Sequence, residues 1–160
     1  MKVISLFLFL ISTCLYSQER KNRIVNDQFV QHLFVDELSP ANIRKHVTGK
    51  VILEMKTQKN KYTSDLDTLL TFKSENCEFT FLKTACKIMF SHAIIRSSCI
   101  KLSNGIEIGF LKRNFLKFIP EAKNVTSDPI VITDTAEFWN DSFYFKDGKL
   151  IKIILFSRID

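Results

Sequence analysis

The sequence is poor in the residues that mark linkers, turns and metal sites. Its 160 residues include only four glycines, three prolines and three histidines. No glycine-rich or serine-rich linker, low-complexity tract or repeat divides the chain, so nothing marks a second domain. No two of the histidines have the spacing of a zinc-binding helix, and no glycine-rich nucleotide motif is present. The sequence therefore predicts no catalytic residue, no bound metal and no cofactor.

The first seventeen residues have the pattern of a secretory signal peptide. Lys2 precedes an apolar run, Val3–Ser12, and the small Ser17 precedes a polar segment. A run of about ten apolar residues is too short to span a bilayer, so we expect cleavage after Ser17 and a periplasmic or secreted mature protein. The alternative is a lipoprotein anchored through Cys14, because Ile11–Cys14 loosely resembles a lipobox.

The mature chain has the size of one domain. Removing 17 of the 160 residues leaves 143, enough to bury a core without additional staples. We expect residues 18–25 to form a flexible lead-in and residues 26–160 a single domain. The full chain has a net charge of +6, and cleavage removes one lysine and no acid, which leaves +5. Export removes nucleic acid from the expected partners, whereas a basic surface favours anionic polymers of the envelope.

Three cysteines remain in the mature chain: Cys77, Cys86 and Cys99. One disulfide is compatible with an oxidising compartment, but an odd number leaves at least one thiol unpaired within the chain. Cys77 and Cys86 each begin an apolar run, so we expect buried and unreactive thiols. The pairing among the three stays open.

Three short helices are expected. An N-cap at Asn26 and apolar residues at helical spacing predict a helix that runs to Leu38. Ser39 before a proline predicts a second helix, Pro40–Thr48. The stretch Phe110–Ile119 carries an apolar stripe and should pack on the sheet as an amphipathic helix.

Alternating apolar and polar residues predict the strands of the sheet. We expect them at Lys50–Lys56, Leu66–Lys73, Glu78–Leu82, Lys87–Leu102, Ile130–Thr133, Ser142–Lys146 and Lys149–Ser157. Lys87–Leu102 is too long for one regular strand, so a bend or bulge is expected near His92–Ser98. The predicted class is α+β, with a mostly antiparallel sheet built from hairpins.

Two turns define the expected hairpins. A three-residue loop that ends at Gly105 aligns the apolar residues on its two sides and places this glycine in the left-handed region. The pair Asp147-Gly148 between apolar runs predicts a two-residue turn, which sets Phe145 opposite Leu150.

Two segments of the second half resemble known proteins. Ile106–Phe110 is an apolar stretch that contains Gly109 and leads into the third predicted helix, and Tyr144–Leu150 forms the closing hairpin. With these segments, Leu102–Ile159 is similar to uncharacterised secreted proteins of Gram-negative bacteria. It also loosely resembles the helix-and-meander unit of β-lactamase-inhibitor-like proteins and of small outer-membrane-assembly lipoproteins. The resemblance implies a non-catalytic envelope domain whose sheet or loops contact another protein, and it transfers no binding residues.

The segment around Phe138 and Trp139 is the strongest candidate for a binding site. It contains the only tryptophan, in a loop with the acidic residues Asp134, Glu137 and Asp141. Aromatic residues on loops are typical of recognition surfaces, although a tryptophan that covers the end of a small core is the more common outcome. Phe138 and Trp139 are therefore the candidate binding residues.

Other residue groups support alternative functions. A thiol and imidazole pair, Cys99 with His92 or His46, would fit a hydrolase with a dispersed active site. Asp65 and Asp67 would share one face of a strand, where we expect them to cap the strand and keep the turn solvated rather than bind calcium. The fifteen phenylalanines would also fit a carrier of an apolar ligand, although a packed core explains them equally well.

The favoured hypothesis is an exported, non-enzymatic domain that binds a protein or polymer of the bacterial envelope. A hydrolase and an apolar-ligand carrier are the alternatives. The sequence leaves the identity of the partner and the oligomeric state open.

Overall fold

A computed structural model describes residues 23–33, 38–47, 49–98, 100–102 and 104–158. The predicted signal peptide, the alternative lipid-attachment residue Cys14, and Cys99 lie outside the described residues. The side chains of His32 and His46 also lie outside this description.

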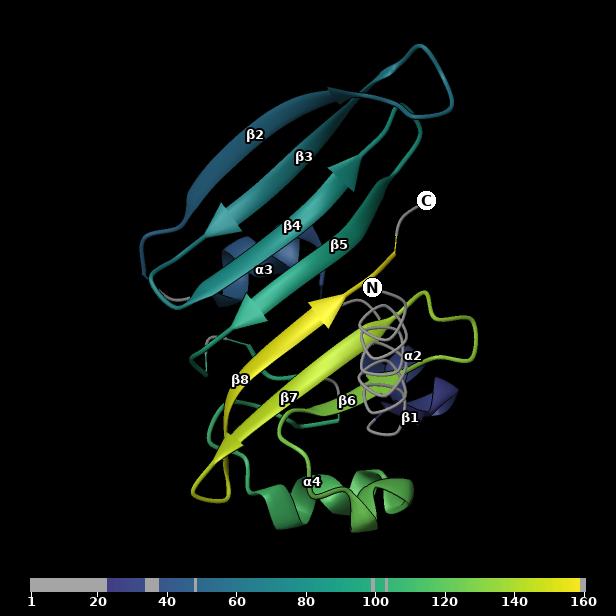
Figure 1. The fold of residues 1–160 in the computed structure, drawn as a ribbon. Coiled ribbons are helices and arrows are strands. Elements are labelled where there is room, and N and C mark those ends of the chain that lie inside the picture. Colours follow the sequence, from purple (N-terminus) through teal and green to yellow (C-terminus); the bar gives the residue numbers. More distant parts are fainter. Residues whose placement is uncertain (1–22, 34–37, 48, 99, 103, 159–160) are drawn as a thin grey trace, which may run out of the picture.

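One eight-stranded sheet organises the chain, with the strand order β1-β6-β7-β8-β5-β4-β3-β2 (Figure 1). The strands are β1 (Arg23–Val25), β2 (Ile52–Lys59), β3 (Leu66–Lys73), β4 (Cys77–Lys83), β5 (Ile88–Ile95), β6 (Ile130–Thr133), β7 (Asn140–Lys146) and β8 (Lys149–Phe156). Six neighbouring pairs are antiparallel, while β1 and β6 are parallel. The α+β class is confirmed, but the sheet is mixed rather than purely antiparallel.

The parallel pair involves residues that the sequence assigned to the lead-in. Ile24 in β1 is buried and pairs with Ile132 in β6, and the backbone N–H of Asn26 continues the contact to the Thr133 carbonyl at 2.9 Å. Strand β1 is three residues long, too short for a periodic pattern to be visible in the sequence. Burial of Ile24 against the sheet therefore orders a segment that its composition marks as polar and basic.

Two short helices precede the long antiparallel part of the sheet. Helix α2 spans Asp27–Leu33, and the Asn26 side chain accepts a hydrogen bond from the Phe29 N–H at 2.8 Å. Helix α3 spans Pro40–His46, and the Ser39 hydroxyl caps it through the Asn42 N–H at 3.2 Å. Both predicted N-caps are confirmed.

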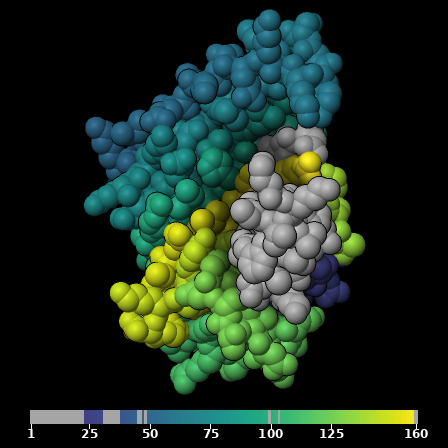
Figure 2. Space-filling model, viewed as in Figure 1, coloured from purple at the N-terminus to yellow at the C-terminus, as the bar shows by residue number. Residues whose placement is uncertain are grey.

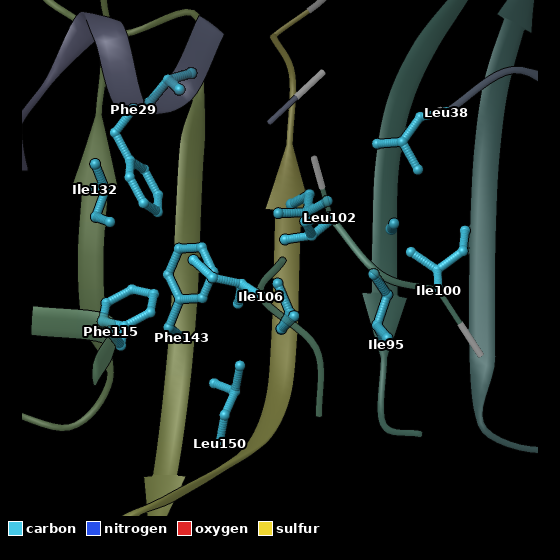
Figure 3. Close-up of a cluster of buried hydrophobic side chains, with 14 of the residues drawn as sticks. Phe29, Leu38, Ile95, Ile100, Leu102, Ile106, Phe115, Ile132, Phe143 and Leu150 are labelled. Carbon is cyan, nitrogen blue, oxygen red and sulfur yellow. The ribbon is translucent and has the colours of Figure 1, made fainter. Parts of the chain in front are cut away.

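Helix α4 (Lys112–Phe118) follows later and leads into the 3₁₀ helix η1 (Pro120–Asn124). The ring of Phe115 from α4 lies 4.7 Å from Phe143 of β7, and the ring of Phe29 from α2 lies 5.8 Å from the same Phe143, as measured between centroids. Figure 3 shows these side chains meeting between the helices and one face of the sheet. The helices therefore cover one face, which we call the core face.

The Asp147-Gly148 hairpin turn is confirmed, whereas at Gly105 the tight turn forms but the described residues on its two sides lie outside the strands of the sheet. Asp147 and Gly148 have φ values of 51° and 72°, and Phe145 pairs with Leu150. Gly105 has a φ of 80°, and the Leu102 N–H donates to the carbonyl oxygen four residues on at 2.9 Å. The turns follow local sequence rules because their left-handed residues are glycine, or an aspartate that tolerates this region.

The expected long strand Lys87–Leu102 is wrong in its second half. Strand β5 ends at Ile95. A β-bulge lies within the strand, because Thr80 of β4 pairs with His92 and Phe81 pairs with Phe90, which leaves Ser91 as the extra residue. The polar residues that follow Ile95 leave the ladder. Apolar residues alternate both in β5 and around Ile100 and Leu102, so the two segments looked like one strand in the sequence.

Strand β2 extends further than the sequence indicated. Its last three residues, Thr57, Gln58 and Lys59, continue the ladder with β3. We expected this polar end to belong to the loop. Pairing with β3 holds it in the sheet, because the edge position allows both faces of the strand to meet water.

Within the described ranges, none of the helices has the length and apolar character needed to traverse a bilayer.

Candidate functional site

Trp139 closes one end of the core. Its ring stacks on Phe90 with 6.1 Å between the centroids and 15° between the planes. The Trp139 N–H donates to the Asp134 carboxylate at 2.9 Å, and its carbonyl accepts from the Thr133 hydroxyl at 2.6 Å. The indole is half-buried and packs against the core. Trp139 is therefore held in place on both sides of its backbone.

Phe138, in contrast, is 49% exposed. Its carbonyl accepts the Arg158 N–H at 2.6 Å, and Trp139 bridges to Ser157 in antiparallel fashion. Because side chains alternate along an extended chain, Phe138 lies on the face of the sheet opposite Trp139. Ser157 pairs with Trp139, so its neighbour Phe156 in β8 lies on the same face as Phe138. Phe156 is 47% exposed. We call these two phenylalanines, Phe138 and Phe156, the aromatic patch.

The three acidic side chains of this loop have different surroundings in the fold. Asp134 fixes the loop backbone, and Glu137 is exposed with a φ of 56°. Asp141 is fully buried, because it alternates with the core residues Phe143 and Phe145 along β7 and so points to the core face. The three carboxylates do not form one site.

Asp141 is the most unusual side chain of the described residues. Neither carboxylate oxygen has a hydrogen-bond partner. Burial raises the pKa of Asp141 well above its usual value of 3.8; the backbone N–H of Phe156 opposes this shift, and the negative charge of Asp134 adds to it. The Phe156 N–H makes no hydrogen bond of good geometry with the carboxylate. A buried carboxyl with this environment favours its protonated form.

Asp65 and Asp67 hold the loop between β2 and β3. Asp67 is buried and accepts a hydrogen bond from the Asn60 side chain at 2.8 Å, while Asp65 accepts from the Thr63 hydroxyl at 3.1 Å. Asn60 in turn accepts from the Tyr62 and Thr63 N–H groups at 2.8 and 3.0 Å. The two carboxylates hold the turn, as expected, but Asp67 is buried, so the expectation that it keeps the turn solvated is wrong.

Two surface hollows lie at opposite ends of the sheet. One, of about 230 Å³, is lined by residues that include Lys59, Lys61, Tyr62, Asp67, Leu82 and Met89. The other, of about 370 Å³, is lined by Arg23, Ser127, Asp128, Pro129, Val131, Asn140 and Ser142. No histidine or cysteine lines either hollow, so neither brings together the groups that the hydrolase hypothesis requires.

Cys77, Cys86 and His92, whose side chains the structure describes, have different surroundings. Cys77 is buried as predicted, but it is disulfide-bonded, whereas Cys86 is free and exposed, so the expectation of a buried Cys86 thiol is wrong. The Thr84 hydroxyl accepts hydrogen bonds from the Cys86 and Lys87 N–H groups and so closes the turn between β4 and β5. Cys86 lies in this turn, where its side chain projects into water. His92 lies 3.6 Å from Glu78, measured from Nε2 to Oε1. Among the described residues, no three metal-ligating side chains form a group that could hold an ion.

Sequence reasoning identified Phe138 and missed Phe156. Phe138 stood out because it lies in a polar loop, where an aromatic residue has no core to enter. Phe156 belongs to an apolar strand that is central in the sheet, and its exposure depends on what covers the open face. Only the three-dimensional arrangement shows that the two rings lie at one end of the sheet.

Comparison of the chain with known protein families, curated proteins and solved structures gave no match. The function is therefore inferred from the side chains of this chain alone.

Proposed function

We propose that the protein is an exported, non-enzymatic binding domain that recognises a protein or an anionic polymer of the bacterial envelope. The observation that carries the proposal is the aromatic patch: Phe138 and Phe156 are both about half exposed and lie on backbone that is held by hydrogen bonds. Exposed aromatic side chains on rigid elements supply large contact area at a low entropic cost. This property suits recognition.

The charge around the patch favours an anionic partner. Arg158 is exposed and follows Phe156 by two residues on the same face. Lys152 lies on that face further along β8, with its ammonium 3.6 Å from the Tyr144 ring centroid. The full chain carries a net charge of +6. Next to the exposed rings, these two cations attract acidic proteins and anionic polymers, an effect that the exposed Glu137 beside Phe138 reduces.

Two further observations favour binding over the alternatives. The phenylalanine rings that a carrier would need around a cavity contact one another, as Phe115 does with Phe29, Phe143 and Phe145. The His92 and Glu78 pair lies on the surface, with both side chains about one-third exposed. These arrangements fit a packed core and a polar contact on the surface.

The proposal places the protein in the periplasm or outside the cell. The apolar N-terminal segment followed by Ser17 supports export with cleavage, and anchoring through Cys14 is the alternative. In both versions, the sheet and its loops make the contact.

The proposal predicts that alanine at Phe138 or Phe156 reduces partner capture by about tenfold or more, the range of a binding hot spot. The measurement is retention of envelope components by immobilised wild-type and variant protein, quantified by mass spectrometry. Phe138 is a better test residue than Trp139, because truncating the stacked indole would also weaken the end of the core.

Phe118→Ala is the matched control. Phe118 is 44% exposed, close to the exposure of the patch rings, but it lies on α4. Capture should be unchanged in this variant. Equal retention by the wild type and both patch variants would contradict the proposed site, as would an equal decrease in the Phe118 control.

A further inference from the structure

The outer edge of β2 has the properties of a pairing surface. β2 is the last strand of the sheet and pairs only with β3. All eight of its residues are exposed, with Met55 at 70% and Ile52 at 51%. Its register with β3 is unbroken, so no bulge protects the edge, and the strand contains no proline. Natural edge strands commonly use such devices to prevent pairing with another chain.

This edge is far from the aromatic patch. Strands β3, β4 and β5 separate β2 from β8. In Figure 1, β2 runs along the outer margin of the sheet, and in Figure 2 the blue atoms of this part of the chain form the upper margin of the molecule. An interaction at the β2 edge is therefore independent of the proposed function.

The geometry of antiparallel pairing limits how two copies of this edge can meet. Along a strand, only alternate residues direct their N–H and C=O groups toward the free edge. Two copies of the same edge form hydrogen bonds only when outward-directed residues face one another. The residue numbers of opposing residues must therefore add to an even number, and the twofold axis passes through one residue.

The charges of β2 select the position of that axis. An axis at Glu54 would oppose two carboxylates, and an axis at Lys56 would oppose two ammonium groups, which destabilises a cross-strand pair. An axis at Met55 instead sets Glu54 of each copy opposite Lys56 of the other, which gives two pairs of opposite charge. Axes at Leu53 or Thr57 shorten the overlap of the strands, and the former also brings lysines together. The sequence is therefore self-complementary only around Met55.

The apolar side chains of β2 favour the same arrangement. Leu53 pairs with Phe72 of β3, and Met55 pairs with Leu70, so all four lie on the core face. With the axis at Met55, the two copies of Met55 face each other and Leu53 lies next to them. The exposed apolar strip at the edge of each sheet would then be shielded by the other. Glu54, which already accepts Lys73 Nζ at 2.7 Å, would lie between two lysines.

We propose that β2 pairs antiparallel with β2 of a second copy of this chain, with Met55 opposite itself and Glu54 opposite Lys56, which joins two eight-stranded sheets into one.

Charge exchange on β2 tests the register. We expect the purified wild-type protein to be dimeric by sedimentation velocity. Lys56→Glu and Glu54→Lys each oppose like charges at two symmetric positions and should weaken self-association by about tenfold or more. An equimolar mixture of these two variants opposes Glu with Lys at every position and should recover the dimer. Lys59→Glu is the matched control, because residue 59 faces Val51 and should leave the dimer intact.

A cysteine scan provides a second, independent measurement. With Cys86 replaced by serine, Met55→Cys should form an intermolecular disulfide on oxidation, because opposing Cα atoms in antiparallel strands lie about 4.5–5.5 Å apart. Thr57→Cys should not, because its copy would lie four residues along, about 14 Å away. A wild-type protein that is monomeric at all concentrations would overturn the proposal and leave the edge to a strand of another protein. Failure of the mixed charge variants to associate would overturn the register.

Discussion

Replacing Asp141 by asparagine is expected to stabilise the protein at neutral pH and to change how its stability depends on pH. The carboxyl is fully buried on the core face, and neither oxygen has a hydrogen-bond partner. Asparagine keeps the shape and cannot ionise, so folding no longer has to hold a proton that the unfolded chain releases at neutral pH. We expect the free energy of unfolding at pH 7 to rise by at least about 1.4 kcal/mol, the value of one unit of pKa shift.

The direction of the pH dependence follows from the raised pKa of Asp141. In the unfolded chain the carboxyl loses its proton near the usual pKa of 3.8, whereas burial keeps the proton on the folded state to higher pH. The folded state is therefore favoured most below pH 3.8. As the pH rises from there toward the raised pKa, each unit removes about 1.4 kcal/mol from the free energy of unfolding. Above the raised pKa this contribution becomes constant.

Urea unfolding between pH 4 and pH 8 measures both effects. The wild type should lose stability relative to Asp141→Asn as the pH rises from 4 toward the raised pKa, so the difference between the two should grow over that part of the range. Asp147→Asn is the control, because Asp147 is exposed in the β7–β8 turn and asparagine tolerates its left-handed backbone. That variant should stay within about 0.5 kcal/mol of the wild type. A difference between Asp141→Asn and the wild type that does not change with pH would contradict the raised pKa of Asp141.

The burial of Asp141 was visible in the alternation of the sequence. Its alternation with Phe143 and Phe145 places it on the core face, and this signal is visible in the sequence. We grouped it with Asp134 and Glu137 in an acidic loop instead, because the three carboxylates lie close in sequence and the predicted strand began only at Ser142. The periodicity was the better guide here, since strand geometry fixes the side-chain direction regardless of chemistry.

Prediction from sequence worked where local rules determine the structure. The bounds of β3 and β6, the N-caps at Asn26 and Ser39, and the Asp147-Gly148 turn each depend on a few adjacent residues. It failed where a distant segment decides the outcome. β1 forms because β6 provides an edge for it, and the polar end of β2 stays in the ladder because β3 lies beside it.

The two proposed surfaces have a joint consequence. The aromatic patch lies beside β8, and the proposed pairing edge is β2, at the far margin of the sheet. A dimer joined at β2 would carry two aromatic patches, one on each copy. An envelope polymer with repeated units could engage both patches, and the second contact would be intramolecular, which raises the overall affinity without any new contact. Lys56→Glu should abolish the dimer. It should then weaken binding to a polymer with repeated units more than binding to a partner protein that offers a single site.

Truncating Phe115 to alanine is expected to cause the largest loss of stability. Phe115 is fully buried, and its ring centroid lies 4.7 Å from Phe143, 5.2 Å from Phe145 and 5.9 Å from Phe29. It therefore links α4, β7 and α2. A cavity of this size in a packed core costs about 3–5 kcal/mol, a large part of the roughly 5–15 kcal/mol that stabilises a domain.

Phe118→Ala on the same helix provides the comparison, because it removes the same ring from a position that is 44% exposed. We expect a change within about 1 kcal/mol, since the ring leaves no buried cavity. Urea unfolding of both variants, followed by circular dichroism, measures the difference. A similar loss in both would mean that α4 contributes through its helix as a whole, whereas a loss confined to Phe115 would establish that this single ring fixes the helix on the sheet and supports the strand that leads to the aromatic patch.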